Sequence, residues 1–198
     1  MRQVELLENE RLDELLTHEL KIIQSNEIFS FSMDAVLLAR FCTVPPRGRI
    51  LDLCTGNGVI PLLLTTRTNA LIDGVEIQFK PYDMARRSVM LNGLEEQIRI
   101  VQGDLKEWHR TVGYGVYDLV TVNPPYLPVH AGDQNVNEQF AIARHEVCCT
   151  LEDVAAACAR LVRYGGKVAM VHRPSRLIEI VQVLTRYKLE PKRLRFVH

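Results

Sequence analysis

Two glycines, Gly56 and Gly58, stand between one apolar segment and the start of a second. In a strand–turn–helix unit, glycines at this position let the backbone come close to a bound nucleotide. A tight structural turn needs only one glycine, so the second favours a ligand site. We predict that the cofactor-binding residues of this turn are Asp52, Cys54, Thr55, Gly56, Asn57 and Gly58.

Two acidic residues follow the next apolar segments. Glu76 is placed to bind the hydroxyls of a ribose, and Asp104 to accept a hydrogen bond from an adenine amino group while the amide of Leu105 donates one. Asp104 could also serve only as a helix N-cap. A dinucleotide-binding turn would carry a third glycine where this sequence has Pro61, which argues against a nicotinamide cofactor.

The tetrapeptide Asn123-Pro124-Pro125-Tyr126 follows directly after the apolar segment Tyr117–Val122. Two prolines after an asparagine force a rigid turn. The Asn123 side-chain oxygen and the Pro124 carbonyl can then accept both hydrogens of a planar NH2 group, which aims the nitrogen lone pair at an electrophile. We predict that Asn123, Pro124 and Tyr126 are catalytic, that Asn123 also borders the cofactor, and that Pro125 and Tyr126 contact the substrate.

The elements that must position these residues alternate between short apolar strands and amphipathic helices after residue 47. This pattern predicts an α/β fold with a Rossmann-like, doubly wound, mainly parallel sheet, whose carboxyl edge carries the site. Helices are expected over Pro81–Leu91 and between Pro174 and Tyr187, and Gly165-Gly166 is expected to end a helix. The expected strands are Arg49–Cys54, Leu71–Ile77, Ile98–Gln102, Tyr117–Val122, Lys167–His172 and a last one around Arg193–Val197.

Residues 1–46 are expected to form an extension ahead of a core of residues 47–198. In it we predict a hairpin of Lys21–Gln24 and Ile28–Phe31 around Ser25-Asn26, and then a helix from Ser32 to about Cys42. The whole chain of 198 residues, 47% of them hydrophobic, is enough for one well-buried domain.

Composition narrows the classes of function. No apolar run reaches the roughly 20 residues of a membrane span, and no signal peptide is evident, so we expect a cytoplasmic protein without a membrane partner. The five cysteines and six histidines lack metal-binding spacings, so we expect no metal site, and Cys148-Cys149 is interpreted as a buried pair.

The net charge is zero, but residues 160–198 carry ten basic and two acidic side chains, a balance of +8. Such a stretch could guide a phosphate backbone, although many are only solvated faces.

The glycine turn, Glu76, Asp104 and the tetrapeptide at Asn123, in this order, resemble the class I S-adenosylmethionine-dependent methyltransferases that methylate amino nitrogens. Within that class, Phe31–Ala39 and Ala143–Glu146 resemble the bacterial enzymes that methylate N6 of the adenosine 3′ of the anticodon in a valine tRNA. The resemblance implies S-adenosylmethionine as cofactor and tRNA as partner. It also implies that Asp34 lies near the methionine end of the cofactor. Arg144 and His145 could contact the RNA substrate, or they could form a hydrogen-bonded structural pair.

The resemblance leaves alternatives open. The glutamine methyltransferases that act on translation release factors share the tetrapeptide, but they carry a further acidic-proline element that is not found here. A non-catalytic cofactor-binding partner protein is a second alternative, and the presence of both Asn123 and Asp104 weighs against it. The tRNA-methylating family continues beyond His198 with a seventh, antiparallel strand. We therefore expect this seventh strand to be missing here and the sheet edge after the fifth strand to be open.

Overall fold

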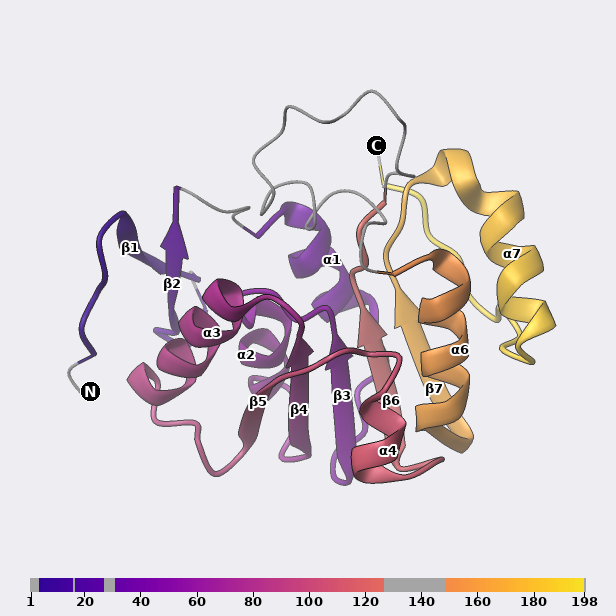
Figure 1. The fold of residues 1–198 in the computed structure, drawn as a ribbon, viewed down its shortest axis with the longest axis horizontal. Helices are drawn as coiled ribbons and strands as arrows, with labels where there is room; N and C mark the ends of the chain where they lie inside the picture. The colour runs from indigo at the N-terminus through magenta and orange to yellow at the C-terminus, as the bar shows by residue number, and fades with distance from the viewer. Residues whose placement is uncertain (1–3, 16, 27–30, 127–148, 198) are drawn as a thin grey trace.

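The structure, a computed structural model, describes residues 4–15, 17–26, 31–126 and 149–197. Its centre is a five-stranded sheet with the order β5-β4-β3-β6-β7, in which every neighbouring pair is parallel (Figure 1). The strands are β3 (Arg49–Leu53), β4 (Leu71–Glu76), β5 (Ile98–Gln102), β6 (Tyr117–Val122) and β7 (Val162–Met170). The predicted Rossmann-like sheet is therefore confirmed.

Helices cover both faces of this sheet (Figure 1). Alternate strand residues point to opposite faces, so Ile50 packs in one apolar cluster and Leu51 in the other. The first cluster joins the sheet to α1 (Met33–Phe41), α2 (Val59–Thr65) and α3 (Phe79–Leu91). The second joins it to α4 (Trp108–Val112) and α6 (Leu151–Leu161), and α7 (Leu177–Arg186) packs on α6 after a short 3-10 turn, η1 (Pro174–Arg176). The core thus consists of two layers separated by the sheet.

Most of the predicted elements agree with the structure. The strands Ile98–Gln102 and Tyr117–Val122 have the predicted bounds, and the strands that begin at Arg49 and Leu71 end one residue earlier than predicted. Ser32 is the N-cap of α1, as predicted. The helix predicted from Pro81 begins two residues earlier, at Phe79, and ends at Leu91 as predicted.

The fifth core strand differs from the prediction. β7 begins at Val162, directly after α6, and Gly165-Gly166 lies inside the strand instead of ending a helix. The register shifts between the pairs Tyr117–Val162 and Leu119–Lys167, so the glycines lie in an irregular part of the ladder. A Cβ on Gly166 would lie 2.9 Å from the Arg163 carbonyl oxygen. Gly166 is therefore required by a close backbone approach and not by a helix end.

The prediction of a strand around Arg193–Val197 is wrong. Residues 191–197 form no strand, and β7 is the edge strand of the sheet in the part of the chain that the structure describes. Arg193 binds α1 instead: its guanidinium lies 4.0 Å from the centre of the Phe41 ring and donates a hydrogen bond to the Phe41 carbonyl. The expected open edge at β7 is confirmed for the described residues.

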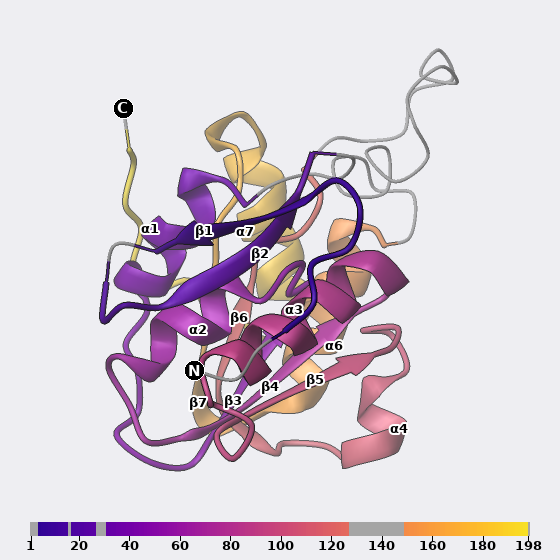
Figure 2. The ribbon, with the colours of Figure 1, turned by 90° about the vertical axis from the view of Figure 1, so that its left-hand side faces the viewer.

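β2 (Lys21–Ser25) pairs antiparallel with the earlier strand β1 (Glu10–Glu14), a strand that the sequence did not predict. The predicted pairing with Ile28–Phe31 stays a prediction, because residues 27–30 lie outside the described residues. The hairpin lies against α3 (Figure 2). The amide of Ile23 donates to the Ser88 hydroxyl at 2.9 Å, and buried Arg87 pairs with Glu10. No helix in the described residues is long and apolar enough to cross a membrane.

Candidate active site

The glycine turn connects β3 to α2 in a conformation that depends on left-handed residues. Cys54, Gly56 and Gly58 have φ values of 56°, 56° and 85°, a region that favours glycine. A Cβ on Gly58 would also lie 3.1 Å from the Cβ of Ala85 in α3. The two glycines thus allow the left-handed backbone of the turn, and Gly58 also allows close packing against α3. The turn lies at the carboxyl edge of the sheet.

Asp52 lies behind this turn and is completely buried. Its two carboxylate oxygens accept hydrogen bonds from the hydroxyls of Thr55 and Thr121, each at 2.6 Å. Burial raises the pKa of Asp52 to about 7, although these two hydrogen bonds oppose the shift. Asp52 therefore holds the turn through Thr55, and a direct contact with a cofactor stays a prediction.

Glu76 lies at the end of β4 and faces the same turn. Its carboxylate accepts the amide of Gly56 at 2.9 Å and the amide of Gln78 at 3.0 Å. Burial raises the pKa of this carboxyl, and the backbone amides lower it in part. A buried carboxylate held by two amides is already oriented toward the turn, which suits the binding of a pair of hydroxyls.

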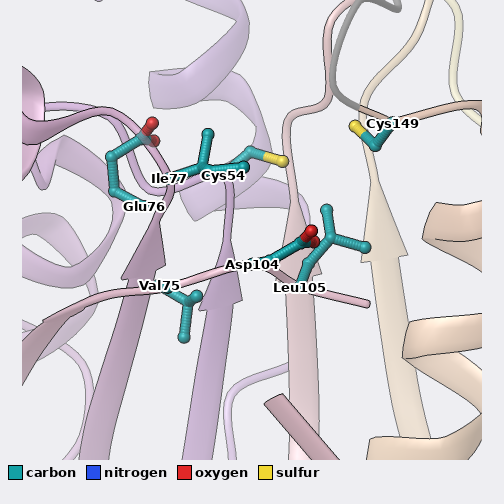
Figure 3. A pocket seen from close by; sticks show the side chains of 8 residues that line it. Cys54, Val75, Glu76, Ile77, Asp104, Leu105 and Cys149 are labelled. Atoms are coloured by element: carbon teal, nitrogen blue, oxygen red, sulfur yellow. The ribbon is translucent and has the colours of Figure 1, made fainter. Parts of the chain in front are cut away.

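Glu76 and Asp104 line one pocket at the carboxyl ends of β3, β4 and β5 (Figure 3). Asp104 accepts the amide of Lys106 at 2.9 Å, and the Lys106 ammonium lies 3.4 Å from the other Asp104 oxygen. Carboxylates among apolar walls fit a nucleoside, which needs acceptors for its hydroxyl and amino groups and apolar contact for its rings. The pocket is lined by Cys54, Val75, Glu76, Ile77, Gly103, Asp104, Leu105 and Cys149.

Three residues near this pocket were not expected from the sequence. Ile77 follows Glu76 directly, and its place beside an acid that is predicted to bind a ribose is a signal that could have identified it. Cys149 is buried in the pocket wall, and no pattern in the sequence indicates this placement. Gly74 has a packing role: a Cβ there would lie 3.0 Å from the Thr55 hydroxyl oxygen. Cys148 lies outside the described residues.

The turn after β6 brings Asn123, Tyr126 and Asp34 together. The Tyr126 hydroxyl contacts the Asn123 side-chain oxygen and lies 3.2 Å from an Asp34 oxygen at the start of α1. Because the hydroxyl has one hydrogen, it can donate to only one of these oxygens at a time. Burial and the Asp34 carboxylate raise the pKa of Tyr126, so this hydroxyl stays protonated.

The remaining predicted site residues differ in their burial and in their contacts. Pro124 is buried behind the turn, and Pro125 is partly exposed beside Tyr126. Leu105 is buried in the pocket wall and Asn57 reaches the hairpin, where its side chain donates to the Ile23 carbonyl at 3.4 Å. Arg144 and His145 lie outside the described residues.

Comparisons with known proteins identify relatives of this chain. The tRNA1(Val) (adenine(37)-N6)-methyltransferase of Aeromonas salmonicida is 32% identical over 158 residues, which cover 79% of this chain and 64% of that protein. This chain therefore spans less than two thirds of that relative's length.

Solved structures share the fold. A SAM-dependent methyltransferase from Agrobacterium tumefaciens is 15% identical, with a TM-score of 0.62 over 94% of this chain and 60% of that chain. The geranyl diphosphate C-methyltransferase from Streptomyces coelicolor, in complex with S-adenosyl-L-homocysteine, is 14% identical, with a TM-score of 0.51 over 80% of this chain and 51% of that chain. A family model described as methyltransferase small domain matches residues 19–176. Because that match covers most of the chain, the chain belongs to the methyltransferase small domain family.

Proposed function

We propose that this chain transfers a methyl group from S-adenosylmethionine to the exocyclic N6 of an adenine in tRNA, the adenosine 3′ of the anticodon of a valine tRNA. The observation that carries the proposal is the Asn123–Tyr126 turn, which lies at the same edge of the sheet as the pocket with Glu76 and Asp104. The name of the Aeromonas relative supports the choice of substrate. A tRNA substrate also implies a cytoplasmic protein.

The pocket residues divide the binding of the cofactor between them. The Glu76 carboxylate binds the ribose hydroxyls, and Asp104 with the amide of Leu105 binds the adenine ring. The backbone of Thr55–Gly58 borders the rest of the cofactor, and Asp34 lies toward its methionine end. The bound cofactor supplies a sulfonium methyl group, which is already a strong electrophile.

The chain contributes mainly orientation to the reaction. The Asn123 side-chain oxygen and the Pro124 carbonyl accept the two hydrogens of the target amine, and Tyr126 provides a surface for the base to stack on. Holding two reacting groups in line can lower a barrier by several kcal/mol. No strong base is required, because the amine loses its proton after the attack. The target adenosine must leave its stack, which costs less in a partly unpaired loop.

The proposed cofactor is tested first, by calorimetry. S-Adenosylmethionine and S-adenosylhomocysteine should bind, and NADH should not. Tight binding of NADH together with no binding of either sulfur compound would overturn the assignment.

The substrate is tested by transfer of a radiolabelled methyl group to unmodified valine tRNA and, in parallel, to a glutamine-containing release-factor peptide. Label is expected in the RNA. Asn123→Ala should abolish transfer and leave the affinity for the cofactor nearly unchanged, because Asn123 is assigned to the acceptor amine. Label in the peptide and none in the RNA would establish the glutamine alternative. No transfer to either substrate, with the cofactor bound, would favour a non-catalytic binding protein.

A further inference from the structure

Tyr126 is held by two residues that the proposed reaction does not use. Arg176 donates a hydrogen bond from Nη1 to the Tyr126 carbonyl oxygen at 3.0 Å. His172 packs its ring against the Tyr126 ring, with 5.0 Å between the ring centres and 50° between the planes. Both residues belong to the segment between β7 and α7, which follows Tyr126 by more than forty residues in the chain. This segment therefore contacts the catalytic turn through both the backbone and the side chain of Tyr126.

Arg176 is itself fixed by a neighbour. Its guanidinium donates from Nε and Nη2 to the two carboxylate oxygens of Glu179, at 2.7 Å and 2.6 Å, one turn along the chain. The Arg176 side chain is only 14% exposed, whereas the Glu179 side chain is 48% exposed, so the arginine is mostly shielded from water and its partner is not. A forked pair of this kind leaves the guanidinium little freedom. The remaining nitrogen, Nη1, is thus directed at the Tyr126 carbonyl.

His172 is fixed in one protonation state. Its Nδ1 accepts a hydrogen bond from the Arg173 amide at 2.9 Å, which places the ring proton on Nε2. Burial, together with the positive charge of Arg176, lowers the pKa of His172 to about 4, so the ring is neutral at physiological pH. Nε2 is buried and has no hydrogen-bond partner among the described residues. The ring is thus a neutral flat surface against Tyr126.

These contacts matter because the orientation of Tyr126 bears on Asn123. The Tyr126 hydroxyl contacts the same Asn123 oxygen that the proposed reaction requires as an acceptor for the target amine. Asp34 offers a second acceptor for that hydroxyl at 3.2 Å. The hydroxyl can therefore turn to Asp34 when an amine occupies the Asn123 oxygen, provided that the ring and the backbone of Tyr126 stay in place.

We propose that His172 and Arg176 are positioning residues for methyl transfer, which hold the ring and the carbonyl of Tyr126 so that Asn123 presents its oxygen to the acceptor amine. This inference rests on the proposed function, because the turn must bind an amine. It does not depend on whether that amine belongs to RNA or to protein.

The first test compares variants of the full chain in methyl transfer. Arg176→Ala and His172→Ala should each lower kcat by about 100-fold, because small misplacements of reacting groups cost this much. The KM for tRNA and the dissociation constant of S-adenosylmethionine should change by less than about threefold. Arg176→Lys and His172→Phe should recover part of kcat, because lysine can still donate to the carbonyl and phenylalanine can still pack on the ring. The matched control is Arg186→Ala, which removes an exposed ion pair between α7 and Glu152 of α6 and should leave kcat unchanged.

The second test observes Tyr126 directly and needs no substrate. The protein has six tyrosines, so labelling with 3-fluorotyrosine gives a small 19F NMR spectrum in which Tyr126→Phe identifies the Tyr126 resonance. That resonance should shift or broaden in Arg176→Ala and His172→Ala and stay unchanged in Arg186→Ala.

The two tests separate this inference from the proposed function. Wild-type kcat in both alanine variants would overturn the inference while leaving the proposed function intact, and so would an unchanged Tyr126 resonance in both. If the wild-type chain methylates neither tRNA nor peptide, the proposed function fails, and the 19F spectra alone decide whether His172 and Arg176 hold Tyr126.

Discussion

The Glu76 carboxylate accepts hydrogen bonds from two backbone amides, those of Gly56 and Gln78. It therefore has two effects: it orders the glycine turn and offers its remaining acceptor capacity to a ligand. Glu76→Ala should weaken the binding of S-adenosylmethionine by about 1.5 to 3 kcal/mol, the usual contribution of hydrogen bonds to a charged group. Calorimetry measures this change, with Glu107→Ala, at an exposed acid three residues after Asp104, as the control. If Glu76→Ala binds S-adenosylmethionine with wild-type affinity, Glu76 does not bind the cofactor.

The raised pKa of Asp52 predicts how the free energy of unfolding changes with pH. Its pKa is raised from 3.8 to about 7 in the fold, so the stability that its protonated form contributes is fully present below 3.8 and is lost as pH rises through about 7. His172 acts in the opposite direction, because its pKa is lowered from 6.5 to about 4 and stability is lost as pH falls below 6.5. The pH range above 6.5 therefore isolates the effect of the buried acids.

The free energy of unfolding should fall by about 1 kcal/mol between about pH 6.5 and about pH 8. Urea unfolding at several pH values measures this change. Asp52→Asn should show a smaller decrease, because the amide does not ionise and the Thr55 and Thr121 hydroxyls can rotate to suit it. An increase in stability over this range, or an equal decrease in the variant, would contradict the assigned cause.

At the scale of elements, the β1–β2 hairpin depends on one buried ion pair. Arg87 in α3 donates to both Glu10 oxygens, and the two side chains are 10% and 6% exposed. Arg87→Met should lower the free energy of unfolding by about 3 kcal/mol, because it leaves the Glu10 carboxylate buried without its partner. Hydrogen exchange of the Ile23 amide should accelerate as the hairpin loosens.

The controls for this prediction separate charge from packing. The double variant Glu10→Leu, Arg87→Met should regain much of the lost stability, since Glu10 no longer leaves an unpaired buried charge and Asp83, which also pairs with Arg87, keeps its pair with Arg86. Arg86→Met, at an exposed neighbouring position, should change little. If Arg87→Met alone is as stable as the wild-type chain, the ion pair does not hold the hairpin.

The elements that the sequence did not predict lack a local signal. β1 has no buried apolar residue and no alternation of apolar and polar side chains, so only its pairing with β2 makes it a strand. The turn between them uses His18 and Glu19 with positive φ instead of glycine or asparagine. The segment after Lys192 does alternate, but Arg193 binds the end of α1 and no strand lies beside it in the described residues.

In the candidate site, too, the residues with a local sequence signal could be predicted and the contacts between distant segments could not. Glu76, Asp104 and Asn123 could be predicted because each lies at or just after the end of an apolar strand, and the carboxyl ends of parallel strands share one edge. The contacts of Tyr126 with Asp34, His172 and Arg176 could not, because they join α1, the turn after β6 and the segment after β7 across the fold. No local pattern reports such long-range contacts.

At the scale of the whole molecule, the basic C-terminal stretch is less available than its net charge suggests. Several of its cations are paired with acids in the structure: Arg163 with Asp118, Arg176 with Glu179, Arg186 with Glu152 and Lys192 with Glu190. Arg193 and Arg195 both lie over the Phe41 ring, at 4.0 Å and 5.9 Å. Reversing their charge would detach this segment from α1 as well as change the surface potential, so they are poor probes of RNA binding.

Arg173 is a better probe, because it is exposed and lies at the carboxyl edge of the sheet after β7. Burial and Asp34 raise the pKa of Tyr126, and the positive charge of Arg173 opposes them, which places this charge near the turn at Asn123–Tyr126. If RNA phosphates lie at this edge, Arg173 is well placed to contact one.

Methyl transfer to tRNA should therefore weaken steeply as salt rises, because each phosphate contact releases counterions. Arg173→Glu should raise the KM for tRNA and make the slope of log KM against log salt shallower by about 1, while the affinity for S-adenosylmethionine stays unchanged. Arg110→Glu is the matched control, since Arg110 is an exposed arginine on α4 whose reversal alters the net charge equally. A peptide substrate would show a shallow salt dependence in both variants. Equal effects of the two reversals would mean that RNA responds to overall charge and not to this edge of the sheet.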